Sequence, residues 1–127
     1  MAHTKMKNII IVFLGGGLGS LFRYFISYLM GVSKSSFPWP TLLANYLGCF
    51  LIGMLLSWAL KYDALRSNLY FFTVIGFCGG LTTFSTFSAE GLQLLKTGNT
   101  ISFFSYVLLS VVGGLGAVAL GHLAFKS

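Results

Sequence analysis

Residues 68–95 read NLYFFTVIGFCGGLTTFSTFSAEGLQLL, and this stretch decides the fold. It is long and apolar enough to cross a bilayer, which takes about 20 helical residues. Its centre, however, holds Gly79 and Gly80 followed by a pair of threonines, and each glycine destabilises a helix by about 1 kcal/mol relative to alanine. We predict a helix broken mid-membrane near residues 79–82, where freed backbone groups must face protein, water or an ion. The alternative is a plain kink with tight packing.

Three further apolar runs of similar length lie on either side of this stretch, over about residues 7–30, 41–60 and 100–125. The chain has 127 residues, of which 56% are hydrophobic and 8% are charged, so it holds four spans and no soluble domain. We therefore predict one all-α membrane domain over residues 1–127. The first run lacks a convincing cleavage site and is interpreted as a retained helix rather than a signal peptide.

The net charge of +6 comes from basic residues that sit singly or in pairs beside the apolar runs. This placement is typical of anchors at lipid headgroups, whereas nucleic-acid binding would gather them on one polar face. An even number of spans puts both termini on one side, and the positive-inside rule places that side in the cytoplasm, although the bias is small. That side carries Lys5, Lys7, Lys61, Arg66 and Lys126, and the other carries Lys34 and Lys96.

The sequence is poor in groups that could perform chemistry. Its only acids are Asp63 and Glu90, and its two histidines lie near the chain ends. No nucleophile, base and orienting group can be assembled, so we do not expect an enzyme, and a proton-coupled pump is also disfavoured. Cys49 and Cys78 lie within apolar runs without metal-site or redox spacing. We interpret them as apolar fillers.

Small residues recur at intervals of four within the spans. Gly15 and Gly19 do so in the first, and Gly113 and Gly121 lie on one face of the fourth. Small residues at this spacing let helix backbones approach closely in lipid. The pattern predicts a tight bundle, which could include a second chain.

Phenylalanines and hydroxyl residues alternate directly after the predicted break. Phe84 and Phe87 are three apart and so share one helix face. An aromatic ring has a positive edge, and two such edges would give an anion the weak contacts that conduction requires. The hydroxyl residues of this segment that we include in the candidate pore are Thr83, Ser85 and Ser88.

Other spans add further donors. Arg23 lies within the first span, where it is either functional or snorkels to the interface. Asn45 offers two N–H donors, and Tyr106 and Ser110 lie four apart on one face of the fourth span. Each alone is more often an interhelical hydrogen bond, but together they suit a small hydrated anion. Glu90 fits poorly, because an unpaired carboxylate three residues past Phe87 would repel an anion.

The residues also resemble those of a known family. The chain is similar over essentially its whole length to the Fluc (CrcB) fluoride channels, and the last of the matching segments is the most specific. These segments are GGGLG at 15–19 before Arg23 and Tyr24, TLLAN at 41–45 before Gly48, and GFCGGLTTFSTF at 76–87.

The resemblance implies an antiparallel, dual-topology homodimer with two fluoride pores along the subunit interface. Phe84 and Phe87 would be the pore phenylalanines, with Asn45 beside them. A structural sodium ion would lie on the twofold axis, held by the backbone carbonyls of Gly79 and Thr82 from both subunits.

The resemblance further implies a polar track along the fourth span and a basic residue at the pore entrance. Tyr106 and Ser110 correspond to the track, and Arg23 corresponds to the basic residue. Gly114 stands where the family continues the track with a hydroxyl.

We therefore expect a fluoride-selective channel that exports fluoride passively across a bacterial inner membrane and relieves its toxicity. One alternative is a small dual-topology multidrug-type cation exporter, but those depend on an acid in the first helix and residues 7–30 have none. Another is a non-transporting membrane adaptor, which would not need a broken helix flanked by spaced phenylalanines and hydroxyls.

Overall fold

The computed structural model describes residues 1–31 and 36–126, and every element in that part of the chain is helical. The all-α prediction is confirmed for these residues. Lys34, counted above among the loop charges, lies outside them. In chain order the elements are α1 (Ala2–Met30), α2 (Trp39–Lys61), α3 (Asn68–Tyr70), the π-helix η1 (Phe71–Cys78), α4 (Gly79–Leu81), α5 (Phe84–Lys96) and α6 (Thr100–Lys126).

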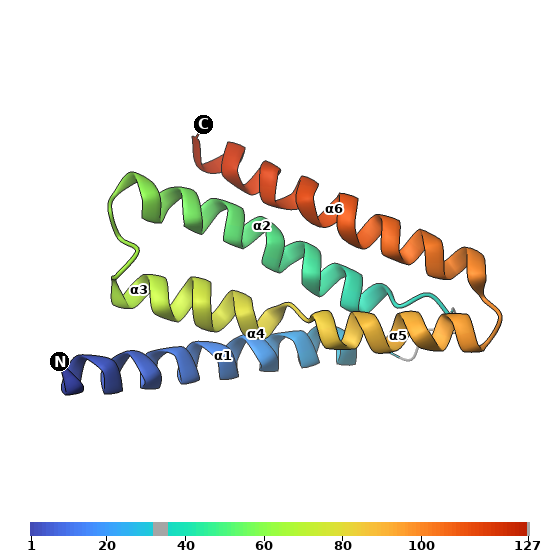
Figure 1. Cartoon of the computed structure of the whole chain (residues 1–127), viewed down its shortest axis with the longest axis horizontal. Helices are drawn as coiled ribbons and strands as arrows, with labels where there is room; N and C mark the ends of the chain where they lie inside the picture. Colours follow the sequence, from blue (N-terminus) through green and yellow to red (C-terminus); the bar gives the residue numbers. More distant parts are fainter. Residues whose placement is uncertain (32–35, 127) are drawn as a thin grey trace.

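The helices lie side by side in an elongated bundle (Figure 1). In that view α6, α2, the η1–α4 segment and α1 follow one another from one edge of the bundle to the other. Both termini and the connection between α2 and α3 lie at one end, and α5 runs to the opposite end beside the start of α6.

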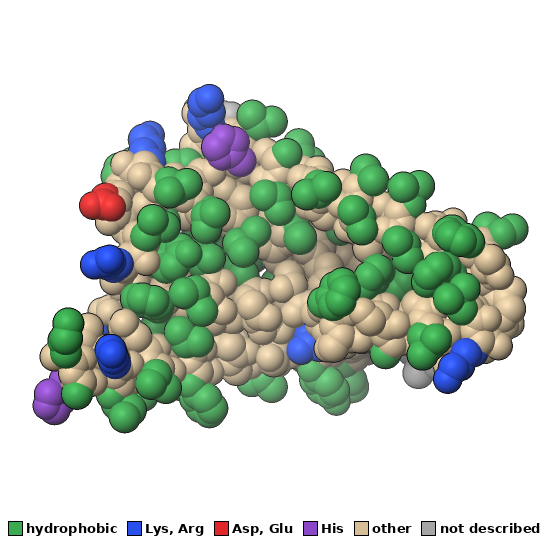
Figure 2. Space-filling model, in the orientation of Figure 1, with side chains coloured by type: hydrophobic (Ala, Val, Ile, Leu, Met, Phe, Trp, Pro, Cys, Tyr) green, Lys and Arg blue, Asp and Glu red, His purple; other side chains and the backbone are tan. Residues whose placement is uncertain are grey.

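Much of the outer surface is apolar. Four helical stretches of the described chain are long and apolar enough to cross a membrane. Of the apolar 18-residue stretch of α6 that could span a membrane, only 11% is buried within the chain. Hydrophobic side chains cover the face seen in Figure 2, and basic side chains lie mainly near the ends of the molecule. This surface is suited to lipid or to a partner chain rather than to water.

Glycines set the distance between neighbouring helices. A Cβ on Gly15 or Gly19 of α1 would clash with backbone carbonyl oxygens of η1, those of Phe72 and Phe77. A Cβ on Gly121 of α6 would clash in the same way with α2. The predicted small-residue packing faces are therefore confirmed.

The third helical stretch is irregular. Its first part contains η1, a π-helix of eight residues, which the sequence did not predict. After α4 the backbone is extended at Thr82 (ψ 154°) and Thr83 (φ −151°, ψ 118°), and α5 then begins at Phe84. Gly79 itself keeps helical angles of φ −63° and ψ −37°, so the extended residues follow the glycines. The depth of this interruption in a membrane stays a prediction.

Candidate functional site

A cavity of about 310 Å³ lies where α2, α5 and α6 meet the interruption. The space exists because the backbone of Thr82 and Thr83 is extended rather than helical. Gly48 of α2 has no side chain, so the side chain of Thr82 can pack directly against α2. Six of the residues singled out from the sequence line the cavity: Asn45, Thr82, Thr83, Phe84, Phe87 and Ser110.

The carboxamide of Asn45 pairs with the backbone of Thr83. Asn45 Oδ1 accepts a hydrogen bond of 2.7 Å from Thr83 N, and Asn45 Nδ2 donates one of 3.3 Å to Thr83 O. Both backbone groups of an extended residue are thereby satisfied by a side chain from another helix. One N–H of the carboxamide remains for a further partner.

The side chain of Thr83 starts α5. Its Oγ1 accepts a hydrogen bond of 3.1 Å from Thr86 N, which is the geometry of an N-cap, and donates one of 3.0 Å to Thr86 Oγ1. The Asn45 side chain therefore holds the backbone of Thr83, and the Thr83 side chain holds the first turn of α5.

These two arrangements release two carbonyl oxygens. In a continuous α-helix the amides of Thr83 and Thr86 would donate to Gly79 O and Thr82 O respectively. Here they donate to the Asn45 and Thr83 side chains instead. Gly79 O and Thr82 O thus lose these usual helical donors, as do the carbonyls between them, before the start of α5.

Ser110 brings a hydroxyl group to the cavity wall from α6. Its Oγ is buried, and within the described part of the chain it has no hydrogen-bond partner. Buried polar groups are nearly always hydrogen-bonded. In this rotamer Oγ has almost no exposed surface, so the side chain must turn toward the cavity before the hydroxyl can reach a ligand there.

The two phenylalanines lie next to each other but differ in their support. Their ring centroids are 5.7 Å apart with planes tilted by 46°. Phe87 also packs on Tyr106, with centroids 5.1 Å apart, whereas 80% of Phe84 is exposed in the single chain. Phe87 is supported by packing within the chain, and Phe84 has an open face.

Glu90 is held by two hydroxyl groups, an arrangement that the sequence did not reveal. Thr41 Oγ1 donates to Glu90 Oε1 at 2.7 Å, and Tyr106 Oη donates to Oε2 at 2.9 Å. This cluster joins α2, α5 and α6. The spacing of four between Thr41 and Asn45 puts both on one face of α2, but it gives no signal for the contact with Glu90.

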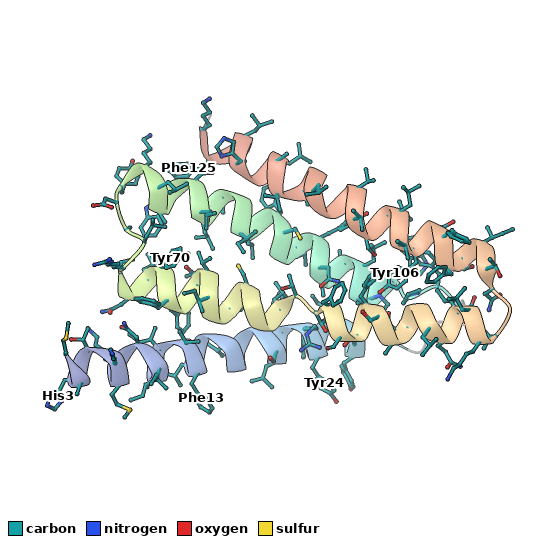
Figure 3. The ribbon with its side chains drawn as sticks, in the orientation of Figure 1. His3, Phe13, Tyr24, Tyr70, Tyr106 and Phe125 are labelled. Atoms are coloured by element: carbon teal, nitrogen blue, oxygen red, sulfur yellow. The ribbon has the colours of Figure 1, made fainter. Side chains whose placement is uncertain are left out.

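Tyr106 lies between α6, α5 and the start of α2 (Figure 3). It is fully buried, at 0% exposure, and packs behind Phe87 rather than lining the cavity. Of Tyr106 and Ser110, which lie one turn apart on α6, only Ser110 lines the cavity.

Four other predicted residues also lie outside the cavity lining. Arg23 Nε donates to Gly80 O at 3.1 Å, so its guanidinium contacts α4 just before the interruption. Ser85 is exposed, and Ser88 Oγ donates to Phe84 O at 2.9 Å along the helix. Gly79 is exposed, with no atom within 4 Å of a Cβ built on it, so its backbone can be approached closely.

Comparisons with known proteins agree with one another. Residues 10–122 match the family described as CrcB-like protein, Camphor Resistance (CrcB). A protein of Leptospira interrogans named Fluoride-specific ion channel FluC is 46% identical over 122 residues, or 95% of this chain and 96% of the relative. Proteins with the same name from Phocaeicola vulgatus and Geobacter sp. are 45% and 44% identical, over 91% and 96% of this chain and 96% and 99% of the relatives.

These relatives are named as ion channels, which is not a class of enzyme. The four long apolar helices and the channel relatives together make this chain a multi-pass membrane protein. The match covers nearly the whole chain, and the chain belongs to the CrcB family.

Proposed function

We propose that this chain is a subunit of a fluoride-selective channel that lets fluoride leave the cell passively and so relieves its toxicity. The observation that carries the proposal is the buried Ser110 hydroxyl, which lacks a partner in the described chain and lies in the wall of a cavity shared with Asn45 and two phenylalanines. The names of the relatives support fluoride as the ion.

The conduction step follows from these groups. Fluoride sheds part of its water and takes hydrogen bonds from the Ser110 hydroxyl, once that side chain turns toward the cavity, and from the remaining N–H of Asn45. The positive ring edges of Phe84 and Phe87 add weak contacts. Arg23 donates to Gly80 O instead of lining the cavity, so its guanidinium does not hold the ion there.

The functional unit that we propose is an antiparallel homodimer with subunits inserted in opposite orientations. A second copy would cover the 80%-exposed ring of Phe84 and part of the largely exposed α6. The weak charge bias between the two sides also supports insertion in either direction.

A structural sodium ion on the twofold axis belongs to the same proposal. Sodium is a hard cation and takes oxygen ligands, as calcium and magnesium do. Gly79 O and Thr82 O, whose helical donors are diverted, fit this role, and the open surface at Gly79 leaves room for a second subunit. A bound cation there would supply fixed positive charge between the two interruptions.

The relatives come from bacteria, which supports the bacterial inner membrane as the location. The multidrug-type cation exporter is not supported, because the relatives are named as fluoride channels and α1 contains no Asp or Glu.

The deciding experiment is fluoride efflux from liposomes that hold the purified protein, read with a fluoride electrode beside chloride-loaded liposomes. We expect rapid fluoride loss without chloride loss. Folded protein that passes neither ion would contradict the proposal, and equal flux of both would contradict its selectivity.

The dual topology has a separate test. A Thr4→Cys variant, which leaves the loop charges unchanged, in a background with Cys49 and Cys78 replaced by alanine, is labelled in sealed vesicles with a membrane-impermeant thiol reagent. Opposite insertion predicts that about half of the protein is labelled from outside. Complete labelling or none would mean a single orientation.

A further inference from the structure

A pocket of about 340 Å³, lined largely by polar and basic residues, lies at the end of the molecule where α2 and α6 finish, away from the interruption. Ser57 and Lys61 line it from α2, and His122, Phe125 and Lys126 line it from α6. Lys61 and Lys126 are the last residues of their helices. In a membrane-spanning helix this is the depth of the lipid headgroups.

The pocket carries positive charge. Within residues 1–31 and 36–126 no acidic side chain lines it: Asp63 is exposed beyond the end of α2, and Glu90 is bound to Thr41 and Tyr106 elsewhere. The ammonium group of Lys61 lies 5.5 Å from the ring centroids of Tyr62 and Phe125.

Phe125 lies near the C-terminal end of α2 (Figure 3), and its ring packs edge-on against Tyr62 at 6.5 Å. Lys61 is thus positioned by two aromatic rings rather than by an acid. Its charge remains available to an anion.

A hydrogen bond between Ser57 and His122 forms the inner wall of the pocket. Ser57 Oγ lies 2.7 Å from Gly53 O, to which it can donate, and it also shares a hydrogen bond with His122 Nδ1.

An apolar groove of about 440 Å³ continues from this wall along α2 and α6 and shares Ser57 and His122 with the pocket. Ile52 and Leu56 of α2 and Leu115 and Val118 of α6 are among its lining residues. At Gly53 the two helices approach so closely that a Cβ would clash with Val118 O. The groove is therefore an open apolar depression between α2 and α6. It runs from the headgroup level toward the membrane interior.

We propose that this composite site binds one anionic phospholipid, with the phosphate between Lys61 and Lys126 and an acyl chain in the α2–α6 groove. A free phosphate ion would use the pocket but not the groove. A neutral lipid would use the groove but gain nothing from the lysines. Basic pockets between transmembrane helices bind anionic headgroups in this way, and the polar-to-apolar order along the site matches that of a lipid molecule.

The test is native mass spectrometry of the purified full-length protein after exchange into detergent with equal amounts of phosphatidylglycerol and phosphatidylcholine of matched chains. We expect preferential retention of phosphatidylglycerol. Replacing Lys61 and Lys126 by glutamine should weaken retention about fivefold for each lysine, whereas Lys5→Gln with Lys7→Gln, at the same end of the bundle but outside the pocket, should not. Circular dichroism establishes that each variant is folded.

Two further arms separate the lipid from its headgroup. Ala119→Phe places a ring in the groove that Ala119 lines and should reduce retention, while Ala124→Phe, on α6 outside the groove, should leave it unchanged. Excess glycerol 3-phosphate should not displace the lipid. Equal retention of both lipids, equal losses in the two double-lysine variants, no effect of Ala119→Phe, or displacement by glycerol phosphate would each overturn the proposal. Because binding is read without ion flux, these outcomes leave the channel proposal untouched.

Discussion

Asn45 and Thr83 are joined by a pair of hydrogen bonds between a side-chain amide on α2 and the backbone of the interruption, with Oδ1 to N at 2.7 Å and Nδ2 to O at 3.3 Å. The Asn45 carboxamide thereby supplies the Thr83 backbone with an acceptor that a continuous helix would supply from its own chain. This pairing diverts the amide that would otherwise donate to Gly79 O. One side chain thus stabilises the interruption, releases a carbonyl and keeps an N–H at the cavity wall.

Asn45→Ala should therefore lower both stability and fluoride flux. It leaves the backbone N–H of Thr83 without its acceptor and removes the side-chain donor to Thr83 O, which as the N-cap carbonyl keeps its bond within α5. The lost acceptor should cost about 1–3 kcal/mol. Thermal unfolding in detergent and liposome efflux measure the two effects. Asn68→Ala, at an exposed asparagine, is the matched control and should shift stability by no more than about 0.5 kcal/mol. Equal melting curves for both variants would refute the clamping role of Asn45.

Ser110→Ala should separate function from stability. Because Ser110 Oγ has no partner in the described chain, removing it sacrifices no internal hydrogen bond and should leave the melting temperature unchanged or slightly higher. The loss of one donor to the ion, worth about 1 kcal/mol, should slow fluoride efflux roughly fivefold. Ser102→Ala on the same helix should do neither. A large fall in stability would mean that the hydroxyl has a structural partner.

The two phenylalanines should differ in stability but not in function. Replacing either by isoleucine should abolish fluoride flux if both rings contact the ion. Only Phe87→Ile should also cost about 1 kcal/mol of stability, since its ring packs on Tyr106 while Phe84 is 80% exposed. Phe104→Ile, at an exposed ring of α6, should preserve both properties. Normal flux in both pore variants would remove the aromatic rings from the mechanism.

The positions of the long helices could be predicted because apolar runs of bilayer length are a local signal. The runs predicted over about residues 7–30 and 100–125 correspond to α1, Ala2–Met30, and α6, Thr100–Lys126. The π-helix over Phe71–Cys78 has no such local signal. It lies where α1 approaches at Gly15 and Gly19, so its geometry depends on tertiary packing.

The site was predictable in part. The cavity collects Asn45, Phe84 and Ser110 from three helices, and family resemblance rather than spacing suggested that they act together. The sequence presented Asn45 as an anion donor, but its bonds to Thr83 require knowledge of what lies opposite. Likewise, the partner of Glu90 on α2 is 49 positions away, a separation that no periodicity analysis covers.

Glu90→Ala should destabilise the junction of α2, α5 and α6. It removes the acceptor for the Thr41 and Tyr106 hydroxyls and leaves both without their partner in a buried site, at a cost of about 2–4 kcal/mol. Glu90→Gln keeps one acceptor oxygen and should recover roughly half of that loss. Gln93→Ala, at an exposed position of α5, is the control for thermal unfolding. An Ala variant as stable as the control would show that the carboxylate does not hold the junction.

Gly19→Ala and Gly17→Ala form a matched pair on α1. A methyl group on Gly19 would overlap Phe77 O and must push α1 away from η1, which should cost about 1–3 kcal/mol. No atom lies within 4 Å of a Cβ at Gly17, so alanine there should stabilise the helix by up to about 1 kcal/mol. The melting temperatures of the two variants in detergent should therefore move in opposite directions.

The same pair should differ in fluoride flux. Gly80 of α4 also packs on α1, and its carbonyl accepts a hydrogen bond from Arg23. Gly19→Ala should therefore disturb the interruption and reduce flux, whereas Gly17→Ala should not. If both variants melt alike, the close approach of α1 to η1 is not what holds this half of the bundle together.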